Sequence, residues 1–177
     1  SGVSERIQQL EQQYKPLAWE VALAIAAEVS EEKFCKFKDK KEAMEIGIRT
    51  GFAYHTVGIV SAPLEGFTGL RIKKIKDGKE YFAACFAGPV RGAGGTAAAF
   101  CLMIADYIRI RNGYSEYDPD ENEANRYATE LYDYHERVTN LQYKPSPEEI
   151  KYLIKSMPIE VDGDPTEDIE VSNYKDL

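Results

Sequence analysis

The chain has 177 residues, 44% of them hydrophobic and 29% charged, and its formal net charge is −8. These proportions are typical of a folded globular protein and exclude a fibrous or wholly disordered chain. The longest apolar run, Ala97–Ala105, is far shorter than the ~20 residues that cross a bilayer, and no secretion signal opens the chain. Three widely spaced cysteines (Cys35, Cys85 and Cys101) without a CxxC pair predict buried free thiols in a reducing compartment. We therefore expect one domain over residues 1–177, cytoplasmic and without membrane contact.

Charge is distributed unevenly along the chain. Residues 1–114 hold 16 Lys and Arg against 13 Asp and Glu (+3), whereas residues 115–177 hold 6 against 17 (−11). An acidic chain of this kind is a poor candidate for wrapping DNA. Two basic runs nevertheless stand out, Lys33–Lys41 and Arg71–Lys79. Such runs are usually solvated faces, and nucleic-acid contact is the alternative for each.

The N-terminal part, residues 1–58, is expected to be helical. Apolar residues recur at steps of three and four over Ser4–Ser30, a helical pattern that Pro16 should split or kink because proline lacks the amide donor. A second helix is expected over Lys40–His55. Two glycines one turn apart in that helix would let another element approach closely; they are Gly47 and Gly51.

The hydrophobic period changes from Phe67 onward, and residues 67–87 predict a β-hairpin. The pair Asp77-Gly78 supplies its turn, since glycine tolerates the positive φ of a tight hairpin loop. Four cations are interspersed with the apolar residues of the first strand and its end: Arg71, Lys73, Lys74 and Lys76. One face of the hairpin is therefore expected to present a cationic stripe.

Residues 88–112 predict a glycine-rich turn followed by a central helix. The helix is apolar all round over Ala97–Ala105, which indicates burial at the centre of the domain. Backbone amides at a helix start attract anions, so phosphate or backbone approach is a hypothesis for Gly92, Gly94 and Gly95, with Arg91 as a further contact. Close backbone packing is the alternative, because the spacing matches neither a dinucleotide fingerprint nor a P-loop.

Residues 119–156 predict further helices. Asp118 is the candidate N-cap of the first, and Ser146 opens a capping box for the last. Residues 157–177 predict a short strand over Ile159–Val161 and then an acidic tail. The expected fold class is α+β: a mostly helical single domain of about five helices, with a hairpin and a short extra strand around the buried central helix.

Local chemistry proposes no complete active site. The two histidines, His55 and His135, lack a second ligand at metal-binding spacing, and we expect His135 to be structural. The tail carboxylates from Asp162 onward could hold magnesium, but their spacing does not fit a calcium loop, and a solvated acidic turn is favoured. We predict no catalytic residue and no metal site.

Four long strings, in order, resemble one family. They are IVSAPLEGF (Ile59–Phe67), FAGPVRGAGGTAAA (Phe86–Ala99), YHERVTNLQY (Tyr134–Tyr143) and GDPTEDIEVSNYKDL (Gly163–Leu177). Together they resemble the N-terminal region of the large subunit of archaeal family D DNA polymerase, also called DNA polymerase II. The resemblance covers nearly the whole chain from about Tyr14. One departure is Gly92, where the family pattern has Ser.

The resemblance implies a replicative polymerase with a large polymerising subunit and a small subunit with 3′-to-5′ exonuclease activity. Its catalytic aspartates lie downstream of this region, so no catalytic residue is carried onto this chain. The resemblance implies no cofactor in this fragment and magnesium for the holoenzyme. Because no Met precedes Ser1 and Leu177 falls in mid-string, we expect a fragment of the longer subunit.

Two hypotheses of different classes follow. In the first, the chain is a non-catalytic architectural domain that contributes to subunit assembly, to contacts with the phosphates of primer–template DNA, or to both. Its partners are then the rest of the large subunit, the small exonuclease subunit and, weakly or indirectly, the DNA. The residues expected at DNA are Arg71, Lys73, Lys74, Lys76 and Arg91. In the second, twelve tyrosines indicate a protein-only scaffold that self-associates or docks to another subunit. A phosphotransfer enzyme built on the acidic tail is a distant third.

Overall fold

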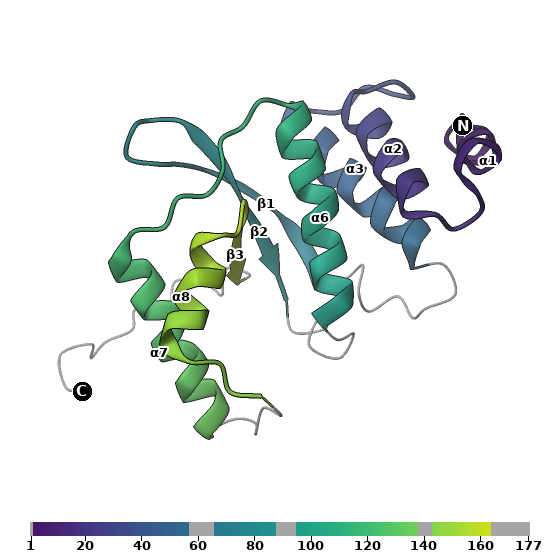
Figure 1. Cartoon of the computed structure of the whole chain (residues 1–177). Coiled ribbons are helices and arrows are strands. Elements are labelled where there is room, and N and C mark those ends of the chain that lie inside the picture. Colours follow the sequence, from purple (N-terminus) through teal and green to yellow (C-terminus); the bar gives the residue numbers. More distant parts are fainter. Residues whose placement is uncertain (1, 57–65, 88–94, 138–142, 164–177) are drawn as a thin grey trace.

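A computed structural model describes residues 2–56, 66–87, 95–137 and 143–163 (Figure 1). In these ranges the elements are α1 (Val3–Tyr14), α2 (Trp19–Ser30), α3 (Lys40–His55), β1 (Phe67–Lys74), β2 (Glu80–Phe86), α6 (Gly95–Arg111), α7 (Glu121–Arg137), α8 (Pro147–Lys155) and β3 (Glu160–Gly163). The expected α+β class, mostly helical with a small sheet, is confirmed. None of the helices in these ranges is long and apolar enough to cross a membrane.

The expected break at Pro16 separates α1 from α2. Lys15 and Leu17, on either side of the proline, have φ of 118° and 61°. Residues other than glycine rarely adopt positive φ. The Tyr54 hydroxyl supports this turn: it accepts from the Leu17 amide at 2.7 Å and donates to the Glu11 carboxylate at 2.7 Å. Polar contacts from α3 therefore fix how α1 joins α2.

The close approach expected at the two glycines of α3 is confirmed. A Cβ on Gly47 would lie 2.5 Å from the Ala26 carbonyl oxygen, and one on Gly51 would lie 2.5 Å from that of Ala22. Both obstacles are backbone atoms of α2, so no side chain can move aside. The absence of side chains at these two positions of α3 sets the spacing of this helix pair.

The sheet has the order β1-β2-β3. β1 and β2 are antiparallel, and the expected turn at Asp77-Gly78 is confirmed, with Gly78 at φ 85°. β3 lies parallel to β2, with Ala83 opposite Glu160 and Cys85 opposite Asp162. The expected extra strand is present, one residue later at its start and two at its end than Ile159–Val161.

The core lies where α2, α3, α6 and one face of the sheet meet (Figure 1). Its buried side chains include Leu23, Met44, Ile48, Phe52, Phe67, Leu70, Phe82, Cys101, Ile104 and Ile108. α6 is central as expected, but it is not buried on all sides: Met103 and Ile110 are exposed. One flank of α6 has no covering element within the described residues, so the uniformly apolar pattern overestimates its burial.

The prediction for the cysteines is right at two positions and wrong at one. Cys85 and Cys101 are buried and form no disulfide, and burial raises the pKa of the Cys101 thiol to about 12. Cys35 is exposed, because it lies in the connection between α2 and α3 rather than in a packed element.

The helix caps follow the sequence at one of two positions. The capping box at the start of α8 is confirmed, because the Ser146 side chain accepts from the Glu149 amide and the Glu149 carboxylate accepts from the Ser146 amide. At α7 the predicted cap is wrong by two residues. Asp120, not Asp118, accepts from the Glu123 amide at 3.0 Å, because α7 begins only at Glu121.

Candidate functional site

The face of the sheet opposite the core carries two of the predicted basic residues. Side chains alternate across a strand, so Leu70 and Ile72 pack into the core while Arg71 and Lys73 lie on the other face. On that face the neighbour of Arg71 in β2 is Ala83. Because alanine is short, cations of β1 reach across β2 to the carboxylates of β3.

Two carboxylates of β3 bind these cations. The Lys73 ammonium lies 2.8 Å from Glu160 Oε1 and 3.0 Å from Asp162 Oδ2, and Arg71 Nη1 lies 3.1 Å from the same Asp162 oxygen. The Tyr81 hydroxyl donates to Glu160 Oε2 at 2.8 Å. The Glu160 side chain is only 5% exposed, so this carboxylate depends on its protein partners.

The electrostatics of the cluster favour its charged state. Burial opposes the charge of Lys73, but hydrogen bonds to Glu160 and Asp162 outweigh it and raise the pKa of the ammonium. Burial likewise acts against ionised Asp162, and Lys73 and Arg71 outweigh it, so the pKa of this carboxyl is lowered. Burial and the bond to Glu160 raise the pKa of Tyr81. The cluster ties β3 to β1 across the middle strand.

The other two hairpin cations lie elsewhere. Lys74 is exposed at the end of β1 with its side chain on the opposite face from Lys73, and no ion pair is found for it within the described residues. Lys76 follows β1, is 88% exposed and lies 3.3 Å from Asp120 Oδ2. The expected single cationic stripe on one face is therefore wrong in its geometry, because the strand alternation and the partners in β3 divide it. Contact of these residues with DNA stays a prediction.

The glycine-rich turn falls mostly outside the described residues. Arg91, Gly92 and Gly94 belong to that part of the chain, and Gly95 is the exposed first residue of α6. A Cβ on Gly95 would meet nothing within 4 Å, so packing does not require a glycine there. Phosphate approach at these positions stays a prediction.

The other basic run, Lys33–Lys41, follows α2, and two of its lysines pair with acidic residues that directly precede the run. Lys33 lies 3.2 Å from Glu31, and Lys36 lies 2.9 Å from Glu32. This pairing agrees with the solvated-face interpretation of the run. These pairs join residues two and four positions apart, so the sequence already indicates them.

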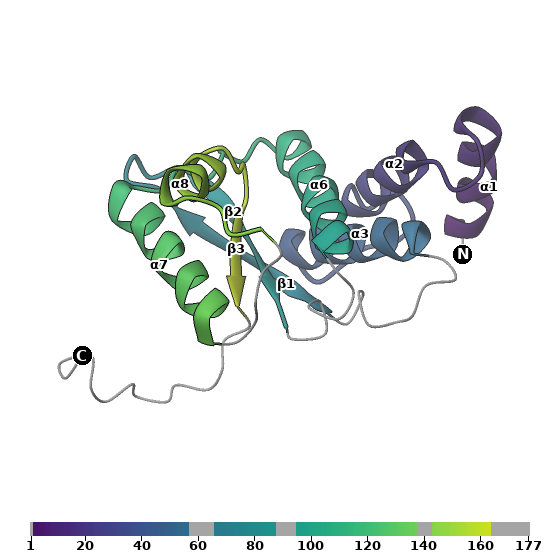
Figure 2. The same cartoon turned by 60° about the horizontal axis from the view of Figure 1, so that its bottom comes forward.

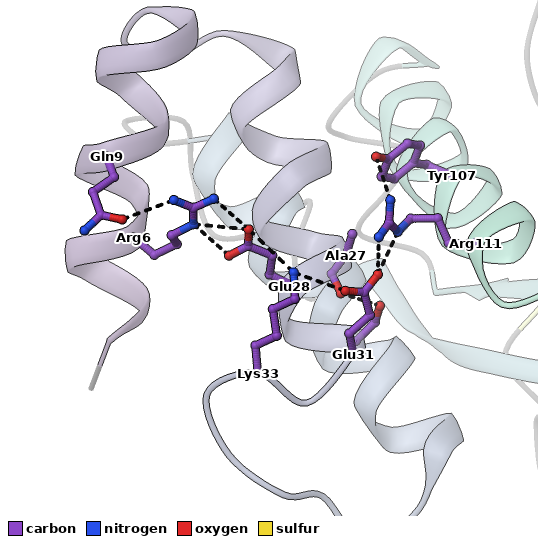
Figure 3. A network of polar contacts seen from close by, with 9 residues as sticks. Arg6, Gln9, Ala27, Glu28, Glu31, Lys33, Tyr107 and Arg111 are labelled. Atoms are coloured by element: carbon purple, nitrogen blue, oxygen red, sulfur yellow. Dashed lines mark hydrogen bonds and ion pairs between the residues drawn. The ribbon is translucent and has the colours of Figure 1, made fainter.

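Figure 3 shows that this charged surface links three helices, an arrangement that the sequence pattern does not predict. Arg6 of α1 forms a two-oxygen contact with Glu28 of α2, and its Nη2 is 2.9 Å from Oε1. Arg111 of α6 binds Glu31 just past the end of α2, and Lys33 lies between the two carboxylates. The network joins α1 and α6 to the end of α2 by polar contacts at the surface.

No grouping of three or more His, Cys, Asp or Glu side chains suited to a metal ion occurs within the described residues. Of the tail carboxylates considered for magnesium, only Asp162 lies within that part of the chain, and it pairs with Arg71 and Lys73. His55 stacks on Phe100 with ring centroids 3.5 Å apart.

The family model described as "DNA polymerase II large subunit DP2, N-terminal" matches residues 1–177. The chain belongs to this family. It is 50% identical over 174 residues to the DNA polymerase II large subunit of Nanoarchaeum equitans, covering 98% of this chain and 14% of that protein. It is 43% identical over 178 residues to that of Methanothermobacter thermautotrophicus, covering 99% of this chain and 16% of the relative. The resemblance found in the sequence is thereby confirmed, and the chain spans only 14–16% of the length of these large subunits.

Proposed function

We propose that this chain is a non-catalytic architectural domain of the large subunit of a replicative archaeal DNA-directed DNA polymerase. The match over residues 1–177 to the N-terminal large-subunit family supports this placement. By the resemblance, the parent holoenzyme also has 3′-to-5′ exonuclease activity in a small subunit and uses magnesium at centres outside this domain. The partners are then the rest of the large subunit, the small subunit and, through the domain's exposed cations, the primer–template.

One observation carries the architectural role: the two inner cations of the hairpin are used inside the domain. Lys73 and Arg71 bind carboxylates of β3, a strand that follows β2 by more than seventy residues. Figures 1 and 2 show the sheet between α1–α3 on one side and the α7–α8 pair on the other. The cluster joins β1, which follows α1–α3 in the chain, to β3, which follows α7 and α8. It therefore links the two ends of the domain through the sheet.

A protein-only scaffold without DNA contact is the second candidate. Pairing of Lys73 and Arg71 with β3 favours it, because paired cations are less available to phosphates. Exposed Lys74 and Lys76 favour DNA contact instead. Both candidates assign no bond-making step to this domain.

The proposal is tested in the assembled polymerase with a substitution that disturbs only the packing of the domain. Gly51→Val places side-chain atoms against the α2 backbone. Gly163→Val, at an exposed glycine whose added Cβ would meet nothing within 4 Å, is the matched control. We expect Gly51→Val to reduce the yield and thermal stability of the purified large–small subunit complex. The kcat of nucleotide incorporation per assembled complex should stay at the control value.

The opposite result contradicts the proposal. If the Gly51→Val complex assembles normally but its kcat falls, the domain takes part in the chemistry. If neither assembly nor kcat changes while the domain itself is destabilised, it has no architectural role in the polymerase.

A further inference from the structure

The short helix α8 leaves two large side chains exposed. Ile150 is buried where α8 packs on α7. Tyr152 and Leu153 are 73% and 56% exposed. At 3.6 residues per turn, Leu153 lies at the edge of the face that carries Ile150, and Tyr152 lies almost opposite Ile150. Both side chains are left in solvent although each is large and apolar or aromatic. The outer face of α8 is therefore suited to a contact beyond the described residues.

This outer face forms one wall of a groove of about 590 Å³. Its lining residues are Tyr143, Pro145, Glu148, Glu149, Tyr152 and Leu153. Tyr143 is 67% exposed, and its hydroxyl donates to the Glu149 carboxylate at 2.9 and 3.0 Å. The Tyr143 ring thus forms the second wall of the groove, facing the exposed side chains of α8, and its hydrogen bond to Glu149 holds it there. Tyrosine and leucine together offer an apolar floor with a polar edge.

The charge at the groove is negative. Hydrogen bonds from the Ser146 amide, and then from Tyr143, lower the pKa of Glu149 and keep its carboxylate ionised. Glu148 stands beside it on the rim. The lysines of α8, Lys151 and Lys155, instead pair with Glu121 of α7 and do not neutralise the groove.

From this geometry we propose that the groove binds an apolar segment flanked by Lys or Arg, supplied by the polymerase polypeptide outside these 177 residues. This inference rests on the proposed architectural function and names a surface through which it acts. The relatives contain far more polypeptide than the matched domain, which is 14–16% of their length. That remaining polypeptide is the proposed source of the segment.

Charge complementarity separates this occupant from two others. A second copy of the chain, docking by the same groove about a two-fold axis, would bring Glu148 and Glu149 against themselves. Nucleic acid would bring phosphates to the same carboxylates. A basic-flanked apolar segment buries Tyr152 and Leu153 and pairs its cations with the rim.

The test uses photo-crosslinking in the purified holoenzyme, assembled from full-length large and small subunits. A benzophenone amino acid replaces Leu153, and the same probe at Ile110, a similarly exposed apolar position on α6, is the control. We expect position 153 to crosslink to one peptide of the large subunit, outside this domain, with apolar residues flanked by Lys or Arg. Adding Glu148→Lys should lower that yield several-fold, because like charges then meet at the rim.

Three outcomes overturn the inference: no crosslink at position 153 above that at 110; a crosslink to the small subunit, to a second copy of the domain or to DNA; or a yield insensitive to Glu148→Lys. A negative crosslinking result does not contradict the proposed architectural function, which the Gly51→Val variant tests by itself. The Gly51→Val experiment reads assembly through the packing of α2 and α3, far in the fold from α8 (Figure 1).

Discussion

At the scale of single residues, Lys73 is the position on which the polar face of the sheet depends. Replacing it with Met removes both ion pairs and leaves the buried Glu160 carboxylate with Tyr81. Loss of hydrogen bonds to a charged group costs about 1.5–3 kcal/mol, and we expect the lower part of that range because Lys73 is one-third exposed. Urea unfolding of the 177-residue chain measures this. Lys36→Met, which removes an exposed pair, should change the free energy of unfolding by less than about 0.5 kcal/mol.

The partner Asp162 gives the same cluster a pH dependence. Its lowered pKa means that the charged carboxylate stabilises the fold above the unfolded value of 3.8, and that this contribution is lost as pH falls through the lower folded value. Asp162→Asn should therefore be less stable than the parent at pH 7, and the difference should vanish in acid below the folded value. Urea unfolding over a pH series measures the gap. A gap that is constant down to strongly acidic pH would mean that the carboxylate charge is not what stabilises β3.

At the scale of elements, the α2–α3 pair makes a sharp prediction. Gly51→Ala gains about 1 kcal/mol of helix propensity, but its Cβ would lie 2.5 Å from the Ala22 carbonyl oxygen, and overpacking typically costs about 1–3 kcal/mol. Because both atoms are tied to helix backbones, we expect the clash to win and the chain to unfold at lower urea. Gly95→Ala has no such neighbour and should be neutral or stabilising. If Gly51→Ala also stabilises, the helices are not held at this spacing.

Patterns among neighbouring residues predict most of the helices and strands, but they do not predict which strands distant in the sequence pair with one another. The glycine spacing in α3, the Asp77-Gly78 turn and the Ser146 cap each act through neighbouring residues, so the sequence displays them directly. The parallel placement of β3 beside β2 is set by packing across the domain. No local pattern singles out Glu160 or distinguishes Asp162 from a solvated tail, although both are the partners of Lys73.

At the scale of the whole molecule, the uneven charge is partly cancelled by the fold itself. The cationic hairpin of the first part of the chain meets carboxylates of the strongly acidic second part, at β3 and at Asp120. On the hairpin, exposed Lys74 has no ion pair within the described residues, and Lys76, 88% exposed, has only a surface pair with Asp120, so these two are the most available to an external phosphate. DNA contact through this hairpin must therefore neutralise few phosphates and be correspondingly modest in its salt dependence.

The sharpest test of DNA contact therefore leaves Lys73 intact, because Lys73→Glu would oppose Glu160 inside the fold. Lys74→Glu/Lys76→Glu in the holoenzyme should weaken primer–template binding and reduce the salt slope by about 2, nearly one for each phosphate that the lysines neutralise. Lys15→Glu/Arg137→Glu makes the same change of charge at exposed positions on other parts of the domain and should leave the slope unchanged. Fluorescence anisotropy over a salt series measures both. Equal slopes for the two variants would mean that the hairpin touches no phosphate, and the domain would then act through protein contacts alone.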